Sequence, residues 1–313
     1  MDSRQKIIWT KMSGAGNSFW ITYLSPSLFP AFADKNWPEV AQKLCQKEEP
    51  SDKGDGLVVL VPSENCDFKW LFYNTDGSSA EMCGNAACCV TEYVFKKGIV
   101  PADRASVTFE TLAQEITGEL VQEKARIFLK QNIDMEGPFK LDFNNETVSY
   151  MFINRSVPHA VIKITNRSEK IDRSDMEKAP LGASLPTGEK EKHSEHAGQA
   201  SISREWQIKK ELAKNLRSKT THHKNGMNVS FYSCSEEEGR LFACTFERGV
   251  EDFTSACGTG ALAVAQVYRR NFPHLDFILV QMPGGQLKVG FHSDKTVSLM
   301  SPVKWLKEMN WFF

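Results

Sequence analysis

The chain has 313 residues, of which 41% are hydrophobic, so it is long enough for two domains and apolar enough to bury a core. Its 38 Lys and Arg balance 39 Asp and Glu to a formal net charge of -1. This balance creates no global field that would recruit a nucleic acid or an anionic membrane, and we expect neither as a partner. The eight cysteines are too sparse for a small disulfide-stapled secreted domain, which excludes that class.

The first residues of the chain contain no apolar core of signal-peptide length. No later run approaches the roughly 18 apolar residues of a membrane-spanning helix. We therefore expect a cytoplasmic protein with reduced cysteines. Free cysteines are most often small buried apolar residues, and we expect that role for six of the eight.

Turn-bounded β-branched and aromatic runs predict strands, and longer periodic stretches predict helices. In chain order these are helix Trp37–Glu48, strands Leu57–Val61 and Phe68–Tyr73, helix Cys83–Lys97, strands Ser106–Glu110, Arg126–Lys130 and Ala160–Thr165, helix Ile202–Arg217, strands Met227–Tyr232 and Leu241–Glu247, helix Cys257–Arg270, and strands Phe277–Met282 and Leu287–Phe291. The balance favours a β-rich α+β protein. The polar, Gly/Ser-rich stretch Ala179–Arg204 is typical of a surface insertion.

Two of the predicted helices lack the charged face of a surface helix. The early turns of Cys83–Lys97 and nearly all of Cys257–Arg270 are uncharged, which is typical of a helix buried on every side. Both begin with Cys-Gly, and 174 residues separate the two cysteines, a little over half the chain. Such an offset indicates a duplicated domain. We expect two pseudo-symmetric halves, each a curled, mainly antiparallel sheet around one central helix.

A cysteine at the start of a helix lies beside unpaired backbone N–H groups and the positive end of the helix dipole. Both lower the pKa of its thiol, and the same N–H groups can hold a carboxylate. If the two halves face one another, Cys83 and Cys257 flank one cleft. One thiolate could then remove a proton from a carbon while the opposite thiol delivers a proton to its other face. This arrangement predicts inversion of a stereocentre by two bases.

The residues alone leave other interpretations open. Either cysteine could be a buried core residue, as we expect for Cys88 and Cys89. A metal site formed from Cys83, Cys88, Cys89, His222 and His223 is disfavoured because no paired C-x2-C motif is present, so we expect no metal. His222 and His223 lie in a polar run and are expected to be solvated loop residues. No pyridoxal or dinucleotide fingerprint occurs in its structural context, so we expect no cofactor.

Several short motifs occur in an order that is specific to one family. They are Lys11-Met12-Ser13-Gly14-Ala15-Gly16-Asn17-Ser18-Phe19, Gly54-Asp55-Gly56, Asn74-Thr75-Asp76-Gly77-Ser78, Glu81-Met82-Cys83-Gly84-Asn85, Pro158-His159, Asn228, Glu247-Arg248-Gly249-Val250, Ala256-Cys257-Gly258-Thr259-Gly260 and Pro283-Gly284-Gly285. With them the chain resembles the diaminopimelate epimerases, cofactor-independent enzymes that interconvert LL- and meso-2,6-diaminopimelate on the route to lysine and peptidoglycan. The resemblance covers nearly the whole length apart from the insertion.

The resemblance implies a function for each matching residue. The catalytic set would be the two acid/base thiols with two neighbours that tune or relay protons: Cys83, Cys257, His159 and Glu247. The substrate-binding set would be Asn17, Asp55, Asn74, Gly84, Asn85, Asn228, Arg248, Gly258 and Thr259. Within that set the backbone after each cysteine would bind the carboxylate at the reacting centre, and the Arg248 guanidinium would suit the distal carboxylate. The resemblance also implies a small amino-acid substrate and a homodimer.

The chain departs from the family pattern at four positions. Val157 replaces an asparagine before Pro-His, Ser13 and Ser18 replace a histidine and an aspartate, and Cys88 replaces an arginine. Loss of an amide at a site that discriminates by hydrogen bonds can shift specificity. The alternative function is therefore a racemase or epimerase of the same fold for another amino acid.

Two further interpretations remain, neither of them an epimerase. One is a non-catalytic protein that keeps the site for a carboxylated ligand, and the other is a cysteine hydrolase using one thiol with His159. Loss of either helix-start cysteine would favour the first, and neither is lost; the second leaves one of these cysteines without a role. The predicted lobes are residues 1–130 with 303–313, and residues 131–302.

Overall fold

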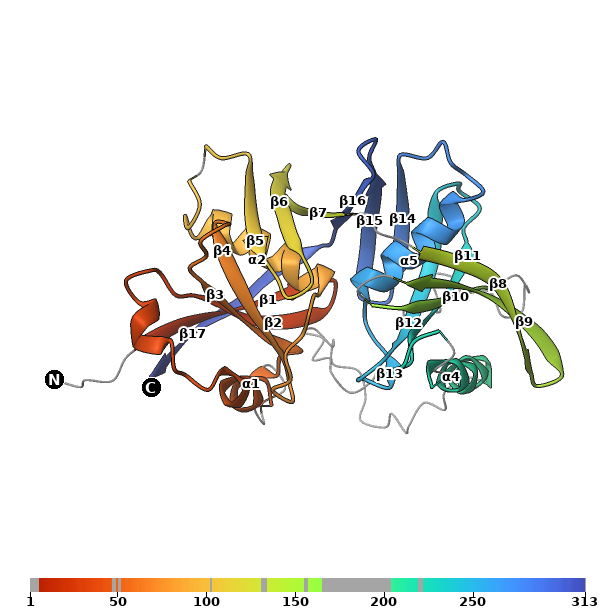
Figure 1. Ribbon diagram of the computed structural model, residues 1–313, viewed down its shortest axis with the longest axis horizontal. Helices are drawn as coiled ribbons and strands as arrows, with labels where there is room; N and C mark the ends of the chain where they lie inside the picture. Colours follow the sequence, from red (N-terminus) through yellow and green to blue (C-terminus); the bar gives the residue numbers. More distant parts are fainter. Residues whose placement is uncertain are drawn as a thin grey trace, which may run out of the picture. The chain divides into compact units, whose positions relative to one another are not determined.

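The computed structural model describes residues 6–46, 49, 52–101, 103–130, 134–154, 157–164, 204–218 and 222–312. Backbone contacts divide the chain into two compact units (Figure 1). Unit 1 comprises Met1–Gln131 and Gly285–Phe313, and unit 2 comprises Asn132–Gly284. Each is an α+β unit in which a mixed, mainly antiparallel sheet curls around one helix, as the sequence predicts.

Unit 1 is built from one long sheet, two helices and a short 3-10 helix. Its elements are β1 Lys6–Gly14, β2 Asn17–Tyr23, η1 Phe29–Phe32, α1 Trp37–Cys45, β3 Gly56–Val61, β4 Phe68–Asn74, α2 Gly84–Lys96, β5 Ser106–Glu110, β6 Glu115–Val121, β7 Lys124–Lys130, β15 Gly285–Phe291, β16 Thr296–Met300 and β17 Val303–Phe312. The strands pair in the order β17-β1-β2-β3-β4-β5-β6-β7-β16-β15. Only β2–β3 and β4–β5 are parallel pairs among them.

Unit 2 repeats this plan with fewer strands. Its elements are β8 Asp134–Phe143, β9 Glu146–Asn154, β10 His159–Lys163, α4 Arg204–Arg217, β11 Asn228–Cys234, β12 Arg240–Glu247, β13 Asp252–Phe253, α5 Gly258–Arg269 and β14 Phe277–Met282. The strands pair in the order β8-β9-β10-β11-β12-β14, with β10–β11 and β12–β14 parallel. The antiparallel trio β8-β9-β10 followed by parallel β11 matches β17-β1-β2 followed by parallel β3. The shared pattern supports the duplication inferred from the sequence.

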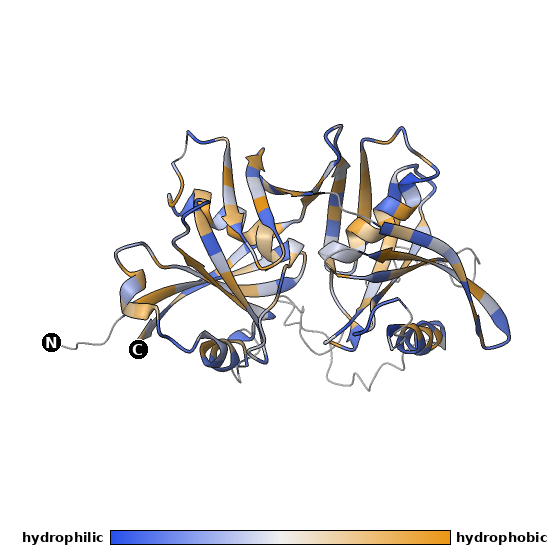
Figure 2. Cartoon of the chain, viewed as in Figure 1, coloured by the Kyte–Doolittle hydropathy of each residue, from blue (hydrophilic) through white to orange (hydrophobic). Residues whose placement is uncertain are grey.

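The two apolar helices lie at the centres of the two units (Figure 1). Helix α2 contacts β1, β2, β6, β7 and β17, whereas α5 contacts β10, β11, β12 and β14. Nearly all of their residues are buried, and both are mostly apolar or neutral in Figure 2. A charge on such a helix would lose its hydration, which explains why the charged residues gather in the last turns. The position of these helices was predicted from their composition.

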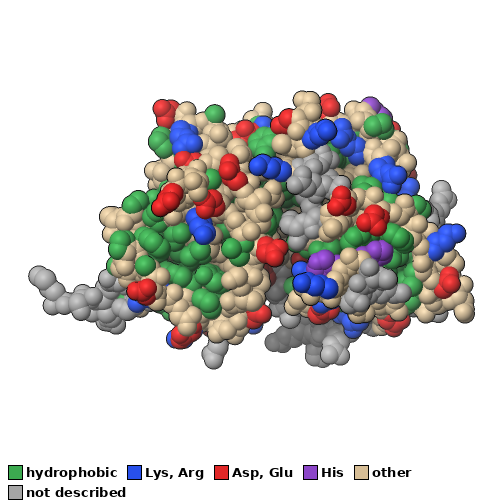
Figure 3. Space-filling view, in the orientation of Figure 1, with side chains coloured by type: hydrophobic (Ala, Val, Ile, Leu, Met, Phe, Trp, Pro, Cys, Tyr) green, Lys and Arg blue, Asp and Glu red, His purple; other side chains and the backbone are tan. Residues whose placement is uncertain are grey.

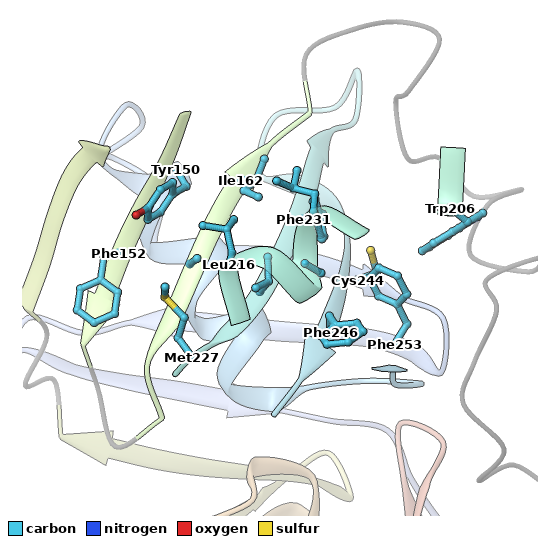
Figure 4. Close-up of a cluster of buried hydrophobic side chains, with 14 residues drawn as sticks. Tyr150, Phe152, Ile162, Trp206, Leu216, Met227, Phe231, Cys244, Phe246 and Phe253 are labelled. Carbon is cyan, nitrogen blue, oxygen red and sulfur yellow. The ribbon is translucent and has the colours of Figure 1, made fainter. Parts of the chain in front are cut away.

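The amphipathic helices α1 and α4 cover the other faces of the two sheets. In unit 2, α4 contributes Trp206, Leu212, Ala213 and Leu216 to a core completed by aromatic and aliphatic side chains of β9 to β13, among them Phe231 (Figure 4). In unit 1, α1 packs Trp37, Val40, Ala41 and Leu44 against β1, β2 and β3. Each unit thus has its own apolar core outside the central helix.

The structure differs from the predicted organisation in three places. Residues 285–302, predicted in the second lobe, belong to unit 1, because β16 pairs with β7 through Thr296 to Met300. Helix α1 ends at Cys45 rather than at Glu48. His222 lies in a loop as expected but is half-buried: its ring centroid is 4.5 Å from those of both Phe139 and Phe152, and its Nε2 is 2.9 Å from the Tyr150 hydroxyl.

The insertion predicted at 179–204 falls almost wholly outside the described residues. In the part of the chain that is described, no helix combines the length and apolar composition needed to cross a bilayer. Acidic and basic side chains are interspersed on the face of each unit seen in Figure 3, in keeping with the balanced charge.

Candidate active site

Cys257 caps the buried helix α5 of unit 2. Its backbone is extended, with φ -116 and ψ 109, and its side chain is 5% exposed. The sulfur accepts a hydrogen bond from the backbone N–H of Gly260 at 3.3 Å and lies 3.3 Å from the Thr259 hydroxyl. Both contacts and the positive end of the helix favour negative charge on sulfur. The site is therefore built to carry a thiolate.

A chain of hydrogen bonds leads from this sulfur into the sheet. Thr259 Oγ1 is 3.0 Å from Nε2 of His159, the first residue of β10. His159 Nδ1 is 3.0 Å from Ser230 Oγ, and that oxygen is 3.0 Å from Thr245 Oγ1. Ser230 and Thr245 are register partners on β11 and β12, so the sheet pairing sets the length of the chain.

His159 is neutral in this environment. It is 1% exposed, and burial, with a smaller contribution from the charge of Arg248, lowers the pKa of its imidazole from 6.5 to about 3. A neutral imidazole donates from one nitrogen and accepts at the other. The hydrogen bonds can then all point toward sulfur, which suits a thiolate, or all point away, which suits a thiol. The network can serve both protonation states of Cys257 if the hydroxyl groups reorient and the imidazole proton moves between Nε2 and Nδ1.

Asn228 and Arg248 lie next to this network. Asn228 is paired with His159 across β10 and β11, and its Nδ2 is 3.5 Å from His159 Nε2. Its Oδ1 accepts a hydrogen bond from the backbone N–H of Arg248 at 2.8 Å. The half-buried Arg248 guanidinium is anchored only by a 3.5 Å contact with Gly226 O among the bonds recorded for its side chain. A cation so placed can turn toward a carboxylate.

Glu247 closes β12 and is tied to the segment that leads into α5. Its Oε1 accepts a hydrogen bond from the Thr254 hydroxyl, three residues before Cys257. The carboxylate thus fixes the segment that precedes α5. This observed contact is with Thr254, whereas the expected proximity of Glu247 to the thiol stays a prediction.

Gly260 is required by the close approach of α5 to the sheet. A Cβ at this position would collide with Thr245 Oγ1 and lie 3.1 Å from Ser230 Oγ. The absence of a side chain lets the Gly260 N–H reach the thiol while the two hydroxyls sit beneath the helix. The matching position of α2, with the same offset from its cysteine, is Ala86, which is fully buried.

Unit 1 holds a second helix start with a different neighbourhood. Cys83 caps α2 with extended backbone, φ -141 and ψ 120, and is half-buried. Asn85 is 1% exposed and occupies the position that Thr259 has in α5. Its Nδ2 donates to Asn17 Oδ1 at 2.9 Å, and its Oδ1 accepts from the Ser301 hydroxyl at 3.0 Å. An amide pair therefore replaces the imidazole–hydroxyl pair of unit 2.

Asp55 directly precedes β3, which pairs with β2, and Asn74 ends β4, which pairs with β3. Asp55 exchanges two hydrogen bonds with Ser18: its Oδ2 accepts from Ser18 N–H and its N–H donates to Ser18 O, both at 2.6 Å. Asn74 ends β4 and donates from Nδ2 to Ser78 Oγ at 3.0 Å. In this structure Asp55 is hydrogen-bonded to the start of β2, and Asn74 belongs to the turn that follows β4. A role of either residue in substrate binding stays a prediction.

The structure brings the predicted residues together in two groups. His159, Asn228, Arg248, Cys257 and Thr259 form one hydrogen-bonded cluster in unit 2, and Asn17 with Asn85 forms a smaller one beside α2 in unit 1. Ser230, Thr245 and Ser301 were not predicted. The available signal for the first two was a hydroxyl residue inside each of two apolar strands, at positions that point toward the buried helix.

The remaining cysteines divide by burial. Cys45, Cys88, Cys89 and Cys244 are buried as expected, and desolvation raises the pKa of the Cys45 and Cys88 thiols to about 12. Cys66 and Cys234 are only half-buried, contrary to the expectation for all six. Among the described residues, no group of His, Cys, Asp and Glu has an arrangement that could hold a metal ion.

Comparison with known sequences decides the family. A model of the family described as "Diaminopimelate epimerase" matches residues 9–138. A diaminopimelate epimerase of Caldanaerobacter subterraneus is 31% identical over 296 residues, covering 95% of this chain and 96% of that protein. One from Helicobacter pylori strain P12 is 30% identical over 274 residues, covering 82% and 79% respectively. The chain belongs to the diaminopimelate epimerase family.

Solved structures show the same fold at low sequence identity. A phenazine biosynthesis protein of the PhzF family from Bacillus anthracis has a TM-score of 0.64 at 12% identity, covering 99% of this chain and 100% of that one. A hydroxyproline epimerase from Agrobacterium vitis has a TM-score of 0.63 at 13% identity, covering 100% and 94%. The family fold predicted from the sequence is confirmed.

Proposed function

We propose that this chain is a cofactor-independent isomerase that interconverts LL- and meso-2,6-diaminopimelate, with Cys83 and Cys257 as its two acid/base residues. The observation that carries the proposal is the repeated Cys-Gly helix start in a member of this family. Each thiol caps a buried, uncharged helix in its own unit. A single nucleophile would need only one such cap.

The proposed reaction moves two protons and leaves the enzyme unchanged in composition. One thiolate takes the α-proton and becomes a thiol, while the electron pair of the broken C–H bond stays on the α-carbon. The opposite thiol gives its proton to the other face of that carbon and becomes a thiolate. The configuration inverts, and the two sulfurs exchange protonation states. The mechanism requires both sulfurs to reach the same carbon.

An amino-acid α-proton is far less acidic than a thiol, so the site must stabilise the developing carbanion. We infer that the α-carboxylate binds at the backbone N–H groups of the two helix starts, Gly84-Asn85 and Gly258-Thr259, where helix dipoles favour negative charge. Arg248, with its weakly anchored guanidinium, suits the distal carboxylate. His159 acts through Thr259 on the Cys257 sulfur, as a positioning residue.

Two thiols with this task need a reducing environment, which supports the expectation of a cytoplasmic location. The experiment that tests the reaction is incubation of the reduced protein with LL-diaminopimelate in D2O, followed by NMR and chiral chromatography. We expect meso product whose inverted centre carries solvent deuterium from the first turnover. A protein that neither inverts the substrate nor exchanges its α-proton would contradict the proposal.

A second candidate function is epimerisation of another amino acid on the same fold. Val157, half-buried two residues before His159, stands where the family resemblance predicts an asparagine, and valine can form no side-chain hydrogen bond there. The same D2O exchange run on a panel of amino acids distinguishes the two. Exchange with another amino acid, and none with diaminopimelate, would establish the alternative.

A further inference from the structure

A cavity of about 390 Å³ opens in unit 2 at the carboxyl end of α5. It is lined by Pro138, Ser149, Tyr150, Met151, Val161, Lys163, Tyr232, Val267, Arg270 and Asn271. Its volume falls in the range of about 300–1,000 Å³ typical of small-molecule sites. Since α5 spans 12 residues at about 1.5 Å each, the cavity lies roughly 18 Å from Cys257. It is therefore separate from the proposed reaction site.

The duplication supplies a comparison for this cavity inside the same chain. The offset between the two cysteines places Tyr93, Lys96 and Lys97 of α2 opposite Val267, Arg270 and Asn271 of α5. In unit 1 the Trp305 ring of β17 stacks on Tyr93, with centroids 6.0 Å apart. The Lys96 and Lys97 ammonium groups lie 5.8 and 5.7 Å from its centre. In unit 1 the end of α2 is thus packed against the flat ring of Trp305, which contacts Tyr93 and both lysines.

Unit 2 has lost that ring. Val267 replaces the Tyr93 ring, and β8, the strand that corresponds to β17 by its pairing, lines the cavity with Pro138. Arg270 Nη1 lies 3.7 Å from Met135 Sδ of β8, as Lys96 lies over Trp305. The hollow at the same end of unit 1 has Trp305 itself as a wall. No tryptophan is among the residues that line the cavity of unit 2.

The charge at this helix end has changed as well. In unit 1 the buried Glu92 pairs with Lys96 at 2.6 Å and accepts a hydrogen bond from the Trp305 Nε1 at 3.2 Å. The matching residue of α5 is Gln266, which carries no charge. It is 5% exposed, and neither its Nε2 nor its Oε1 has a hydrogen-bond partner among the described residues. Unit 2 therefore lacks counterparts of both the Glu92 carboxylate and the Trp305 ring.

The two cations at the cavity of unit 2 have no acidic residue beside them in the cavity wall. Lys163 and Arg270 both line the cavity, and no acidic residue does. Within the described part of the chain, neither is recorded in an ion pair. A guanidinium and an ammonium beside an apolar, partly tyrosine-lined wall suit an anion with a hydrophobic body.

We propose that this cavity binds a small flat aromatic carboxylate, whose ring occupies the space that Trp305 fills in unit 1 and whose carboxylate pairs with Lys163 and Arg270. The ring would pack between Val267 and Pro138. The ligand would thus supply a ring and a carboxylate, the two groups that Trp305 and Glu92 provide in unit 1.

Indole-3-acetate is the probe, titrated into the full chain by isothermal calorimetry. We expect saturable 1:1 binding, and much weaker binding of tryptamine, which has the same ring but a cationic tail. Arg270→Gln with Lys163→Gln should weaken binding by about tenfold or more, because two charged partners are lost. Gln266→Glu should also weaken it, since the new carboxylate would pair with Arg270 as Glu92 pairs with Lys96. Lys140→Gln, an exposed change on β8 outside the cavity wall, should bind as the parent does.

Val267→Tyr supplies the ring that stacks on Trp305 in unit 1, so it should tighten binding of the probe and leave the catalytic activity intact. The charge variants carry the test if this substitution does not fold, because both side chains are exposed. Three results would overturn the proposal: no saturation up to about 10 mM probe, unchanged affinity in the double charge variant, or equally tight binding of inorganic phosphate, which has no ring.

Discussion

His159 shows how burial fixes the chemistry of a single residue. In water an imidazole titrates near neutrality, but the surroundings of His159 hold its pKa at about 3. It therefore remains neutral wherever the enzyme could work, and cannot itself act as a cationic acid. Its value lies in being both donor and acceptor between the Thr259 and Ser230 hydroxyls.

Thr259 links the imidazole to the sulfur and offers a clean test of the network. Thr259→Val keeps the shape but removes the hydroxyl, so Cys257 loses one contact that supports its charged form. We expect kcat to fall by about 10- to 100-fold, the loss typical of one hydrogen bond to a charged group. Thr259→Ser keeps the hydroxyl and should retain most of the activity. Steady-state kinetics with equal losses in both variants would show that the hydroxyl is not used.

The low pKa of His159 also predicts a pH dependence of folding. Between pH 6.5 and about 3 the unfolded chain binds a proton that the folded chain excludes. This contribution to stability is thus fully present above pH 6.5 and declines as the pH falls toward 3, by up to about 1.4 kcal/mol per pH unit.

Urea unfolding at several pH values measures this decline directly. His159→Asn, which copies the side chain of Asn17 in unit 1, should lose less stability than the parent between about pH 6.5 and 4.5. Parallel curves for the two proteins would mean that His159 takes up its proton in the folded state.

At the scale of elements, the sequence predicted the parts that burial makes distinctive. The uncharged helices α2 and α5 and the apolar strands β3, β11 and β12 follow from composition, because no other environment tolerates them. Strands β1, β2, β6, β8, β9, β13, β16 and β17 were not predicted. In β17 the half-buried face includes Lys307, and the exposed face includes Leu306 and Phe312, so polar and apolar residues do not alternate as in a typical strand. Its place is set by pairing with β1, nearly 300 residues away in the sequence.

The candidate site likewise contains residues that the sequence predicts and residues that only tertiary contacts bring together. The two thiols and their N–H groups follow from the Cys-Gly helix starts, and the other predicted residues follow from the family resemblance. The hydroxyl chain through Ser230 and Thr245 could not be predicted, because it depends on the register between β11 and β12. The bond between Asp55 and Ser18 likewise depends on contacts that local sequence does not encode.

The contact between α5 and the sheet can be tested with a paired substitution. Gly260→Ala places a Cβ against Thr245 Oγ1 and should cost about 1–3 kcal/mol of unfolding free energy, as overpacking does. It should also lower activity by moving the N–H that contacts Cys257. Adding Thr245→Ala removes the collision, so the double variant should be more stable than the sum of the single effects predicts. Strict additivity in chemical denaturation would contradict this packing.

At the scale of the whole molecule, the duplication explains both the similarity and the difference of the two units. Each keeps a Cys-Gly start on a buried helix, but the residue that follows the glycine has diverged to Asn85 in one unit and Thr259 in the other. The first bonds to an asparagine and the second to a histidine. Two thiols in unlike surroundings fit a reaction whose two ends, the LL and meso forms, are also unlike.

We infer that one inversion needs both thiols, and the activity of the two single cysteine variants tests this requirement most directly. Cys83→Ala and Cys257→Ala are each incubated with LL- and meso-diaminopimelate in D2O, with the parent as control and circular dichroism to verify folding. We expect the inversion rate of each variant to fall by at least about a thousandfold, as is typical of the loss of an essential acid/base group. Inversion with deuterium incorporation at the parent rate in either variant would contradict it.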